Sequence, residues 1–306
     1  MTTHTPPPKL RCGLLGAGPW AQQTQAPALS AHGGVVFTGV WARRPEAAAE
    51  LATAHGVTAY CGEEGIDALL ADSDAVAFAL PPDIQAPLAA RAAAAGRHLL
   101  LDKPVATTVA AALATADAAA RAQVASVVFC TLRFAPDTES WIAEQSAMGG
   151  WFTAQARWLG SRYAHGVDSG DPPSPWRRER GGLWDIGPHA LSVLVPLLGE
   201  VTRVTAVSGP ADTVHLTLRH TSGASSAVTL GLSAPAAGAG ARVELVGEHG
   251  KVVMPKWDDP VTAFRGAVDE LRASIRTGRQ HPCDVRFGLR VTEILAEAEE
   301  QLDREG

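Results

Sequence analysis

Cysteine is scarce in this sequence, and the few cysteines are scattered. Four occur among 306 residues, and no two of them form a C-x-x-C pair. This spacing excludes a disulfide framework and a cysteine-rich zinc site, and it is typical of reduced thiols in a cytosol. We therefore expect a cytoplasmic protein.

The chain also lacks a basic patch and a long apolar run. Its net charge is −6 and no stripe of basic and aromatic residues occurs, so neither nucleic acid nor an anionic membrane surface is expected as a partner. Charges such as Arg91 and Asp117 interrupt the Ala-rich segments, which excludes a membrane span. Residues 1–8 show no signal-peptide pattern, and their three consecutive prolines predict a disordered lead-in.

Two domains of different architecture are expected, over residues 9–125 and 126–306. The chain has 46% hydrophobic and 19% charged residues, and it is long enough for two hydrophobic cores. The first part alternates apolar strands with helices, which predicts an α/β domain with a doubly wound parallel sheet. The second part has strand candidates in close succession, which predicts an α+β domain with one helix on an open, mostly antiparallel sheet.

Apolar runs and turn residues set the expected elements. In the first domain, strands are predicted over 10–15, 35–42, 74–80, 98–101 and 124–130, and helices over 21–30, 45–55, 66–70, 87–95 and 108–122. In the second, strands are predicted over 151–159, 201–207, 213–219, 227–232, 242–246 and 251–254, and helices over 183–198, 262–277 and 284–302, with a loop over 161–182. Doubly wound sheets bind ligands at the carboxyl ends of their strands.

The first strand ends in a dinucleotide-binding fingerprint, Gly16-x-Gly18-x-x-Ala21. Gly16 permits a tight turn, Gly18 lets a pyrophosphate approach the backbone, and Ala21 lets the next helix pack closely. Pro19 and Trp20 lie in the same turn, where N–H groups of the helix start face the phosphates. An ordinary strand-to-helix turn is the alternative, but the strand before and the helix after favour a nucleotide.

Two arginines follow the second strand, where an NAD site usually has an acidic residue for the ribose hydroxyls. Arg43 and Arg44 can instead hold a 2′-phosphate. A solvated basic pair is the alternative. Because cations at a helix start oppose the helix dipole, an anionic ligand explains the pair better. The sequence therefore favours NADP(H) over NAD(H).

Two further strand ends carry candidate residues. Leu80 and Pro81 end the strand over 74–80, where prolines either fix a loop beside a cofactor or simply stop the strand. Asp102 and Lys103 follow the strand over 98–101. The Lys103 ammonium can hydrogen-bond a substrate oxygen and take part in proton transfer. On spacing alone, a surface Asp–Lys pair is the alternative.

Asp185 and His189 are four residues apart at an expected helix start, so they can share one helix face. A histidine is the natural acid or base for a hydroxyl/carbonyl pair, and a carboxylate can orient it or the substrate. The alternatives are a helix cap for Asp185 and a buried structural role for His189. A metal site would need a third ligand, which is absent at a diagnostic spacing, so no metal is expected.

The loop over 161–182 is rich in aromatic and guanidinium side chains. Such groups suit polyhydroxylated or anionic ligands, and a solvated loop is the alternative for most of them. Tyr163, Trp176 and Arg177 are the substrate-binding candidates. The other members of the set are Arg162, His165, Arg178 and Arg180.

Taken in order, these motifs resemble those of the glucose–fructose oxidoreductase/inositol dehydrogenase (Gfo/Idh/MocA) family. The matching motifs are Gly16-x-Gly18, Leu80-Pro81-Pro82, Gly96-Arg97-His98, Asp102-Lys103-Pro104, Arg133-Phe134, Trp176-Arg177, Gly181-Gly182 and Asp185-x-Gly187-x-His189. The resemblance implies a Rossmann domain, then a domain whose open sheet often makes oligomer contacts, and hence a homo-oligomer, a dimer or tetramer. It also implies Lys103, Asp185 and His189 as catalytic residues, and it adds Arg133 to the substrate-binding candidates.

The family's reaction is hydride transfer between a nicotinamide and a secondary alcohol or ketone, commonly of a sugar or cyclitol. Asp102 stands where the family usually has glutamate, and Gln85 where many members have histidine; both are cofactor-binding candidates through the resemblance. The chain is short for the family, so a trimmed second domain is expected. We predict an NADP(H)-dependent oxidoreductase of a small carbonyl or polyol. The alternatives are a nucleotide-binding sensor without turnover and a non-redox enzyme that uses the nicotinamide transiently.

Overall fold

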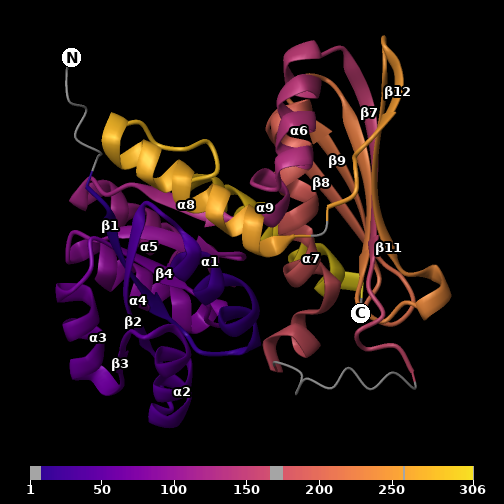
Figure 1. The fold of residues 1–306 in the computed structure, drawn as a ribbon. Helices are drawn as coiled ribbons and strands as arrows, with labels where there is room; N and C mark the ends of the chain where they lie inside the picture. Colours follow the sequence, from indigo (N-terminus) through magenta and orange to yellow (C-terminus); the bar gives the residue numbers. More distant parts are fainter. Residues whose placement is uncertain (1–7, 166–174, 258, 306) are drawn as a thin grey trace, which may run out of the picture. The chain divides into compact units, whose positions relative to one another are not determined.

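The chain forms two compact units, each with its own sheet (Figure 1). The computed structural model describes residues 8–165, 175–257 and 259–305, so the lead-in expected over 1–8 lies almost wholly outside the described residues. The first unit takes in residues 1–105, 113–129 and 259–286, and the second takes in 106–112, 130–258 and 287–306. The chain therefore returns to the first unit late, and the division is not the single boundary at residue 125 that the sequence predicts.

The first unit is built on a parallel sheet. Its strands are β1 (Leu10–Leu15), β2 (Val35–Trp41), β3 (Thr58–Tyr60), β4 (Ala75–Phe78), β5 (His98–Asp102) and β6 (Ser126–Phe129). They lie in the order β3-β2-β1-β4-β5-β6, and every neighbouring pair is parallel. β4 and β6 are buried along their whole length, as strands covered on both faces are. The predicted doubly wound α/β sheet is confirmed, apart from the short edge strand β3, which the sequence does not predict.

Helices pack on this sheet, and local signals fix several of their ends. They are η1 (Ala21–Gln25), α1 (Ala26–Ala31), α2 (Pro45–His55), α3 (Gly62–Ala71), α4 (Pro82–Ala94), α5 (Val109–Ala122) and α8 (Pro260–Thr277). α2 has the predicted bounds, because Pro45 suits a first helical turn and Gly56 ends the helix at φ 65°. α4 begins at Pro82 rather than at 87, since proline is also tolerated at that first position.

Helix α8 joins the first unit although it follows the second sheet in sequence. It contacts β5, β6 and α1, and the Phe264 ring packs edge-to-face on Phe129 with 4.9 Å between centroids. Asp259 caps the helix, accepting hydrogen bonds from the Thr262 hydroxyl and from the N–H groups of Thr262 and Val261. These bonds hold the pKa of the Asp259 carboxyl below its usual range.

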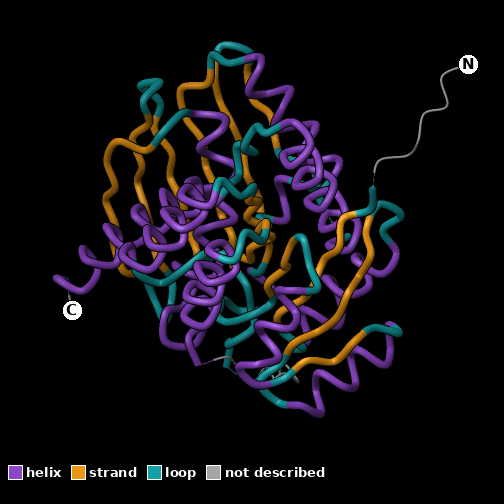
Figure 2. Tube along the Cα trace, turned by 90° about the vertical axis from the view of Figure 1, so that its left-hand side faces the viewer, coloured by secondary structure: helices purple, strands orange, loops and turns teal. Residues whose placement is uncertain are grey.

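The second unit is built on an open sheet, whose strands run side by side in Figure 2. They are β7 (Trp151–Leu159), β8 (Val201–Ser208), β9 (Val214–His220), β10 (Ser225–Gly231), β11 (Gly240–Gly247) and β12 (Gly250–Val253). The order is β12-β11-β7-β10-β9-β8, with β7 and β10 parallel and the other neighbours antiparallel. Buried and exposed residues alternate along β9, so one face meets a core and the other is open. The predicted open, mostly antiparallel sheet is confirmed.

More than one helix covers the inner face of this sheet. The described helices of the unit are η2 (Thr131–Arg133), α6 (Pro136–Met148), α7 (Pro175–Leu198), η3 (Ala236–Gly238) and α9 (Val285–Glu305). Trp184 of α7 and Leu295 of α9 join Leu230 of β10 in one hydrophobic core. The loop expected over 161–182 is wrong for 175–182, which are helical, while 166–174 lie outside the described residues. Within the described part of the chain, no helix is both long and apolar enough to cross a membrane.

Candidate active site

The glycine turn follows β1, the strand at which the order of the sheet reverses: β2 and β3 continue on one side of β1, and β4, β5 and β6 on the other. Doubly wound sheets bind ligands at this position. Gly16 has φ 125°, and a Cβ atom there would lie 2.3 Å from the carbonyl oxygen of Ala79, directly after β4. A Cβ atom at Gly18 would meet no described atom within 4 Å. The backbone is therefore closed toward β4, where Leu80 and Pro81 follow, and open to a ligand at Gly18.

The helix that follows this turn begins with Pro19 and Trp20. The N–H group of Gln22 donates to the Gly18 carbonyl at 3.0 Å, which closes the first turn. The Trp20 ring stacks on Phe129 at the end of β6, with 6.3 Å between centroids. Burial raises the pKa of the Cys12 thiol in β1 to about 12, so this nearby cysteine stays protonated and is not a nucleophile.

The two arginines after β2 have the freedom that a phosphate site requires. Arg43 and Arg44 are exposed, and neither has a hydrogen-bond or ion-pair partner for its side chain among the described residues. Arg44 precedes α2 without capping it. Both guanidinium groups therefore follow β2 at the positive end of a helix dipole, and no ion pair joins either of them to Glu46 or to another described carboxylate.

The buried Gln85 of α4 fastens the segment that follows β5. Its Oε1 atom accepts from the Asp102 N–H at 2.9 Å. Its Nε2 atom donates to the carbonyl oxygens of Asp102, Pro104 and Val105 at 2.9, 3.2 and 3.2 Å. The Asp102 carboxylate accepts from the Lys103 N–H at 2.8 Å. Both polar atoms of the Gln85 amide therefore bind the backbone on either side of Lys103. That Gln85 also contacts a cofactor stays a prediction.

Three glycines let α7 pack closely in the second unit. Gly181, at φ 53° and ψ −154°, kinks the helix. A Cβ atom at Gly182 would lie 2.6 Å from the Cα atom of Gly231 in β10, and one at Gly187 would lie 2.6 Å from a methyl carbon of Leu295 in α9. The part of α7 that carries Asp185 and His189 is thereby fixed against both the sheet and α9.

Gly182→Ala is expected to lower the free energy of unfolding by about 1–3 kcal/mol, because the backbone of β10 must move to admit the methyl group. Urea denaturation followed by circular dichroism measures the change. Gly238→Ala is the matched control, since a Cβ atom there would meet no described atom within 4 Å. Equal losses in the two variants would contradict the close approach as the cause.

Asp185 is held by an ion pair within α7. The Nε atom of Arg177 donates to its Oδ1 atom at 3.1 Å, and the two side chains are 33% and 14% exposed. The Arg177 guanidinium also lies over the Trp176 ring, 4.9 Å from the centroid. Arg177 and Trp176 thus brace the carboxylate across the kink at Gly181. Sequence reasoning places both in a loop and does not foresee the pairing.

His189 lies one turn after Asp185 and is stacked on an aromatic ring. The Trp158 ring lies nearly parallel to the imidazole, with 5.1 Å between centroids and 19° between planes. The sequence does not single out Trp158. The alternation of side chains along β7 was the available signal for its orientation. Trp158 lies two and four residues after the buried Ala156 and Ala154, and such residues share one face of a strand.

The remaining candidates of the second unit divide into two groups. The Arg133 guanidinium lies 6.0 Å from the Phe287 ring centroid, and Tyr163 packs against the core with its hydroxyl oxygen buried and unbonded among the described residues. Arg180 instead binds the Glu299 carboxylate at 2.7 and 2.9 Å, tying α7 to α9. Arg180 therefore binds a carboxylate of its own unit, and the Nη1 atom of Arg133 donates to the Ser192 carbonyl oxygen at 3.4 Å. Arg133 and Tyr163 stay substrate-binding candidates.

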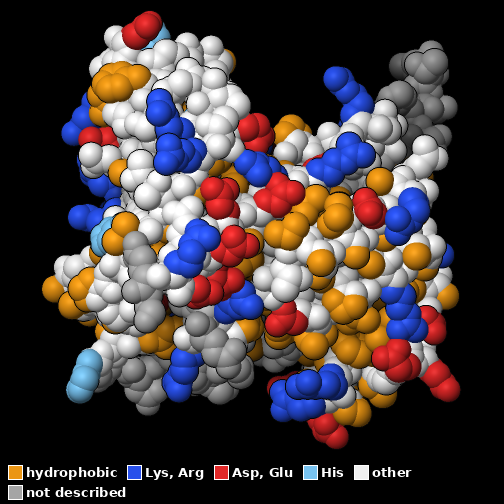
Figure 3. Space-filling model, turned by 180° about the vertical axis from the view of Figure 1, so that it is seen from behind, with side chains coloured by type: hydrophobic (Ala, Val, Ile, Leu, Met, Phe, Trp, Pro, Cys, Tyr) orange, Lys and Arg blue, Asp and Glu red, His pale blue; other side chains and the backbone are white. Residues whose placement is uncertain are grey.

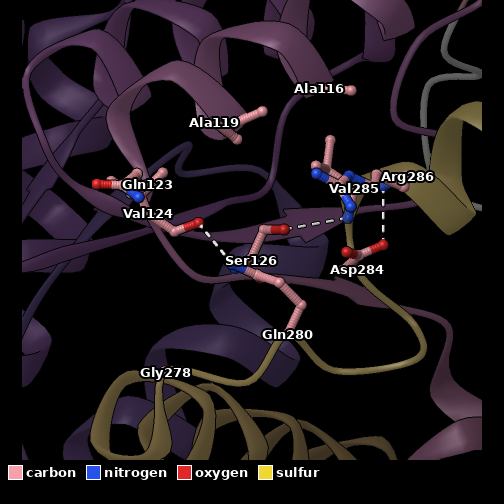
Figure 4. Close-up of a pocket in the computed structure, with 11 residues that line it drawn as sticks. Ala116, Ala119, Gln123, Val124, Ser126, Gly278, Gln280, Asp284, Val285 and Arg286 are labelled. Atoms are coloured by element: carbon pink, nitrogen blue, oxygen red, sulfur yellow. Dashed lines mark hydrogen bonds between the residues drawn. The ribbon is translucent and has the colours of Figure 1, made fainter.

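A hollow of about 240 Å³ at the start of β6 has a different character (Figure 4). The Gln280 side chain accepts from the Ser126 N–H at 3.3 Å, and the Ser126 hydroxyl accepts from the Val285 N–H at 3.1 Å. These groups fasten the chain between α8 and α9 to the sheet edge, so we assign the hollow no chemistry. Across the described ranges, no three His, Cys, Asp or Glu side chains are grouped as metal ligands.

Comparison with known protein families identifies the family of this chain. Residues 10–129 match "Oxidoreductase family, NAD-binding Rossmann fold", and residues 142–253 match "GFO/IDH/MocA C-terminal domain". The chain belongs to the GFO/IDH/MocA oxidoreductase family. The expected family, fold class and enzyme class are confirmed.

Relatives of known name differ in how much of the chain they match. The 4-carboxy-2-hydroxymuconate-6-semialdehyde dehydrogenase of Sphingobium sp. (strain NBRC 103272 / SYK-6) is 25% identical, over 97% of this chain and 100% of that protein. The dTDP-3,4-didehydro-2,6-dideoxy-alpha-D-glucose 3-reductase of Streptomyces antibioticus is 39% identical, over 34% of this chain. The chain matches only 31% of the length of that reductase.

Solved structures share the fold over nearly the whole chain. Levoglucosan dehydrogenase in complex with NADH and L-sorbose has a TM-score of 0.82 at 21% identity, covering 97% of this chain and 98% of the other. A putative myo-inositol dehydrogenase from Sinorhizobium meliloti 1021 has a TM-score of 0.81 at 23% identity, with the same coverage. At this identity the likeness speaks for the fold alone.

Proposed function

We propose that the chain is an NADP(H)-dependent oxidoreductase that transfers a hydride between the nicotinamide and a secondary alcohol or ketone of a sugar, cyclitol or similar molecule. The observation that carries the proposal is the Gln85 amide, which fixes the Lys103 loop at the carboxyl end of β5. The names of a sugar 3-reductase, a levoglucosan dehydrogenase and a putative inositol dehydrogenase among the similar proteins support this substrate class.

The residues of the first unit fit a dinucleotide. Gly16 and Gly18 would hold the pyrophosphate through backbone N–H groups at the open turn, and Trp20 and Pro19 would border it. Arg43 and Arg44 would hold the 2′-phosphate, for which they have free guanidinium groups. When bound, the nicotinamide supplies or accepts the hydride.

Each catalytic candidate would have its own task in the reaction. The Lys103 ammonium donates a hydrogen bond to that oxygen and stabilises the negative charge that develops on it. His189 exchanges a proton with the substrate, and stacking on Trp158 fixes its ring plane. Asp185, held by Arg177, orients the imidazole or a substrate hydroxyl.

Changing both arginines, Arg43→Ala/Arg44→Ala, is expected to weaken NADPH binding by about 10- to 100-fold and to leave NADH binding nearly unchanged. Charge-assisted hydrogen bonds to a phosphate contribute about 1.5–3 kcal/mol, which corresponds to that loss. Calorimetric titration with NADPH, NADP+, NADH and NAD+, one at a time, measures it without a substrate.

The matched control is Arg276→Ala/Arg279→Ala, which removes two exposed arginines of the same unit near the end of α8. It makes the same change in net charge and should leave all four affinities nearly unchanged. Wild-type preference for NADH would instead make Arg43 and Arg44 surface charges, and it would overturn the NADP(H) assignment.

A second substrate class is a carboxylated hydroxy-aldehyde, favoured by the name of the relative that matches over its full length. A turnover screen with NADP+ and NADPH should therefore contain polyols, keto-sugars and carboxylated semialdehydes. Net change in NADPH absorbance argues for the oxidoreductase over transient use of the nicotinamide. Tight binding without turnover of any class would favour a sensor. The expected dimer or tetramer stays a prediction.

A further inference from the structure

Glu299 of α9 binds α7 on both sides of its kink. The Nη1 atom of Arg180 donates to both oxygens of the Glu299 carboxylate, at 2.9 Å to Oε1 and 2.7 Å to Oε2. The Nε1 atom of Trp184 donates to Oε1 at 2.8 Å. Arg180 comes directly before Gly181, where the helix is kinked, and Trp184 comes after it. One carboxylate on another helix therefore spans the kink.

Arg180, Trp184 and Glu299 form one cluster, here called the kink cluster. The Arg180 guanidinium lies over the Trp184 ring, 5.3 Å from its centroid. Trp184 is fully buried, and a buried indole N–H needs an acceptor, which Glu299 supplies. The side chains of Arg180 and Glu299 are 33% and 31% exposed, and a partly buried ion pair is screened less by salt than an exposed one. The kink cluster therefore joins a charged pair to the hydrophobic core.

A second contact between the same two helices lies one turn earlier on α9. Leu295 precedes Glu299 by four residues, so both side chains lie on one face of the helix. A Cβ atom at Gly187 would lie 2.6 Å from a methyl carbon of Leu295. Gly187 lies between Asp185 and His189 in the sequence. Helix α9 therefore contacts α7 at its kink and again at the stretch that carries the catalytic candidates.

The bend of α7 sets the geometry of Asp185. Arg177 lies before Gly181, and its Nε atom donates to the Asp185 carboxylate after it, at 3.1 Å. Because the two residues lie on opposite sides of the kink, a change in the bend alters the distance between them. Glycine has no Cβ atom to restrict its φ and ψ, so the bend must be held by contacts elsewhere. The kink cluster supplies such contacts.

An ion pair alone assigns no such role. Acidic and basic side chains lie next to one another at several places on the surface in Figure 3, and exposed pairs contribute little to stability. Glu293 forms such a pair within α9, where its carboxylate binds Arg290 at 2.9 Å. Glu299 differs because its partners belong to another helix and flank the residue at which that helix bends.

We propose that Glu299 is a positioning residue for the hydride transfer proposed above, on which this inference rests. It holds the bend of α7 at Gly181 and thereby keeps Asp185 paired with Arg177. Its two partners belong to α7, so it acts through that helix and not on the substrate. A misplaced carboxylate in the site lowers turnover even where the fold is intact, because the reaction depends on the orientation of the groups around it.

Hydrogen–deuterium exchange of the full chain tests the hold on the bend without substrate or cofactor. Glu299→Gln keeps an oxygen for the indole N–H but loses the charge and one acceptor that bind Arg180. The N–H groups of residues 177–185 should therefore exchange at least about threefold faster. Glu293→Gln is the matched control, because it removes a paired carboxylate of similar exposure, 38%, from the same helix. Exchange over 177–185 that is equal in Glu299→Gln and wild type would overturn the proposal.

Kinetics of the same variants test the effect on turnover. With the substrate identified by the turnover screen, and well below the unfolding temperature, Glu299→Gln should lower kcat about 10-fold and leave the KM for NADPH nearly unchanged. In an Asp185→Asn background the same change should lower kcat no further, because Glu299 acts through that carboxylate. Its loss of thermal stability should persist in both backgrounds. Lost stability with the wild-type kcat would make Glu299 merely structural and overturn the positioning role.

Two further outcomes separate this inference from the proposed function. Wild-type protein that turns over none of the screened substrates would overturn the proposed function, and exchange over 177–185 would then decide alone whether Glu299 holds the bend. Equal losses of kcat in Glu299→Gln and Glu293→Gln would assign the loss to the change in net charge and overturn the role of the kink cluster.

Discussion

Lys103→Met is expected to lower kcat/KM by about 10²- to 10³-fold while NADPH binding stays nearly unchanged. Methionine keeps the length and apolar stem of lysine but has no N–H donor. One preorganised donor to an oxygen that gains negative charge contributes a factor of this size. The proposed dinucleotide contacts come from the glycine turn and from Arg43 and Arg44, so the affinity should survive the loss of the ammonium.

Steady-state kinetics and calorimetry on the same preparation separate the two effects. Lys256→Met is the matched control, because this lysine is exposed and follows β12, the last strand of the second sheet. Its kinetics should equal those of the wild type. Loss of NADPH binding in Lys103→Met, with an unchanged circular dichroism spectrum, would instead make Lys103 a cofactor ligand and remove it from the chemistry.

Local signals explain which parts of this fold the sequence predicts. β1, α2 and β7 have the predicted bounds. Each is delimited by residues beside it, as Gly16 ends β1 and as Pro45 and Gly56 delimit α2. The nucleotide fingerprint is predictable for the same reason. The 2.3 Å approach to Ala79 shows why its first glycine is needed, but that distance depends on a strand far along the chain.

Features that depend on distant partners are not visible in the sequence. α6 is missed because Thr138 and Gln145 occupy buried positions beside Ile142, and polar side chains there hide the helical period. The return of α8 to the first sheet has no local signal. The stack of Trp158 on His189 has no local signal either, because one residue lies on β7 and the other on α7.

The second large effect is expected for His189→Asn, which should lower kcat by about 10²- to 10⁴-fold with a smaller change in KM. A positioned general acid or base contributes a factor of this size. Asparagine keeps hydrogen-bonding capacity at a similar position but does not exchange a proton near neutral pH. Initial rates over a range of pH measure both the loss of kcat and the loss of its pH dependence.

His220→Asn is the control for a buried histidine of the same unit. Its Nδ1 atom bonds to the Gly199 carbonyl and its Nε2 atom to the Ser226 hydroxyl, each at 2.9 Å. Burial lowers the pKa of His220, so it is neutral in the folded chain near pH 7. The control should lose stability but keep the pH profile of the wild type. A His189→Asn variant that matches it in both respects would assign His189 a structural role.

The double variant Lys103→Met/His189→Asn tests whether proton exchange and stabilisation of the developing negative charge depend on each other. If both act on the same substrate oxygen, the double variant loses less than the product of the single losses, because each side chain is of little use without the other. Losses that multiply would place them in separate steps. A wild-type kcat in His189→Asn alone would leave Lys103 as the proton donor, with Asp185 and Arg177 orienting the substrate.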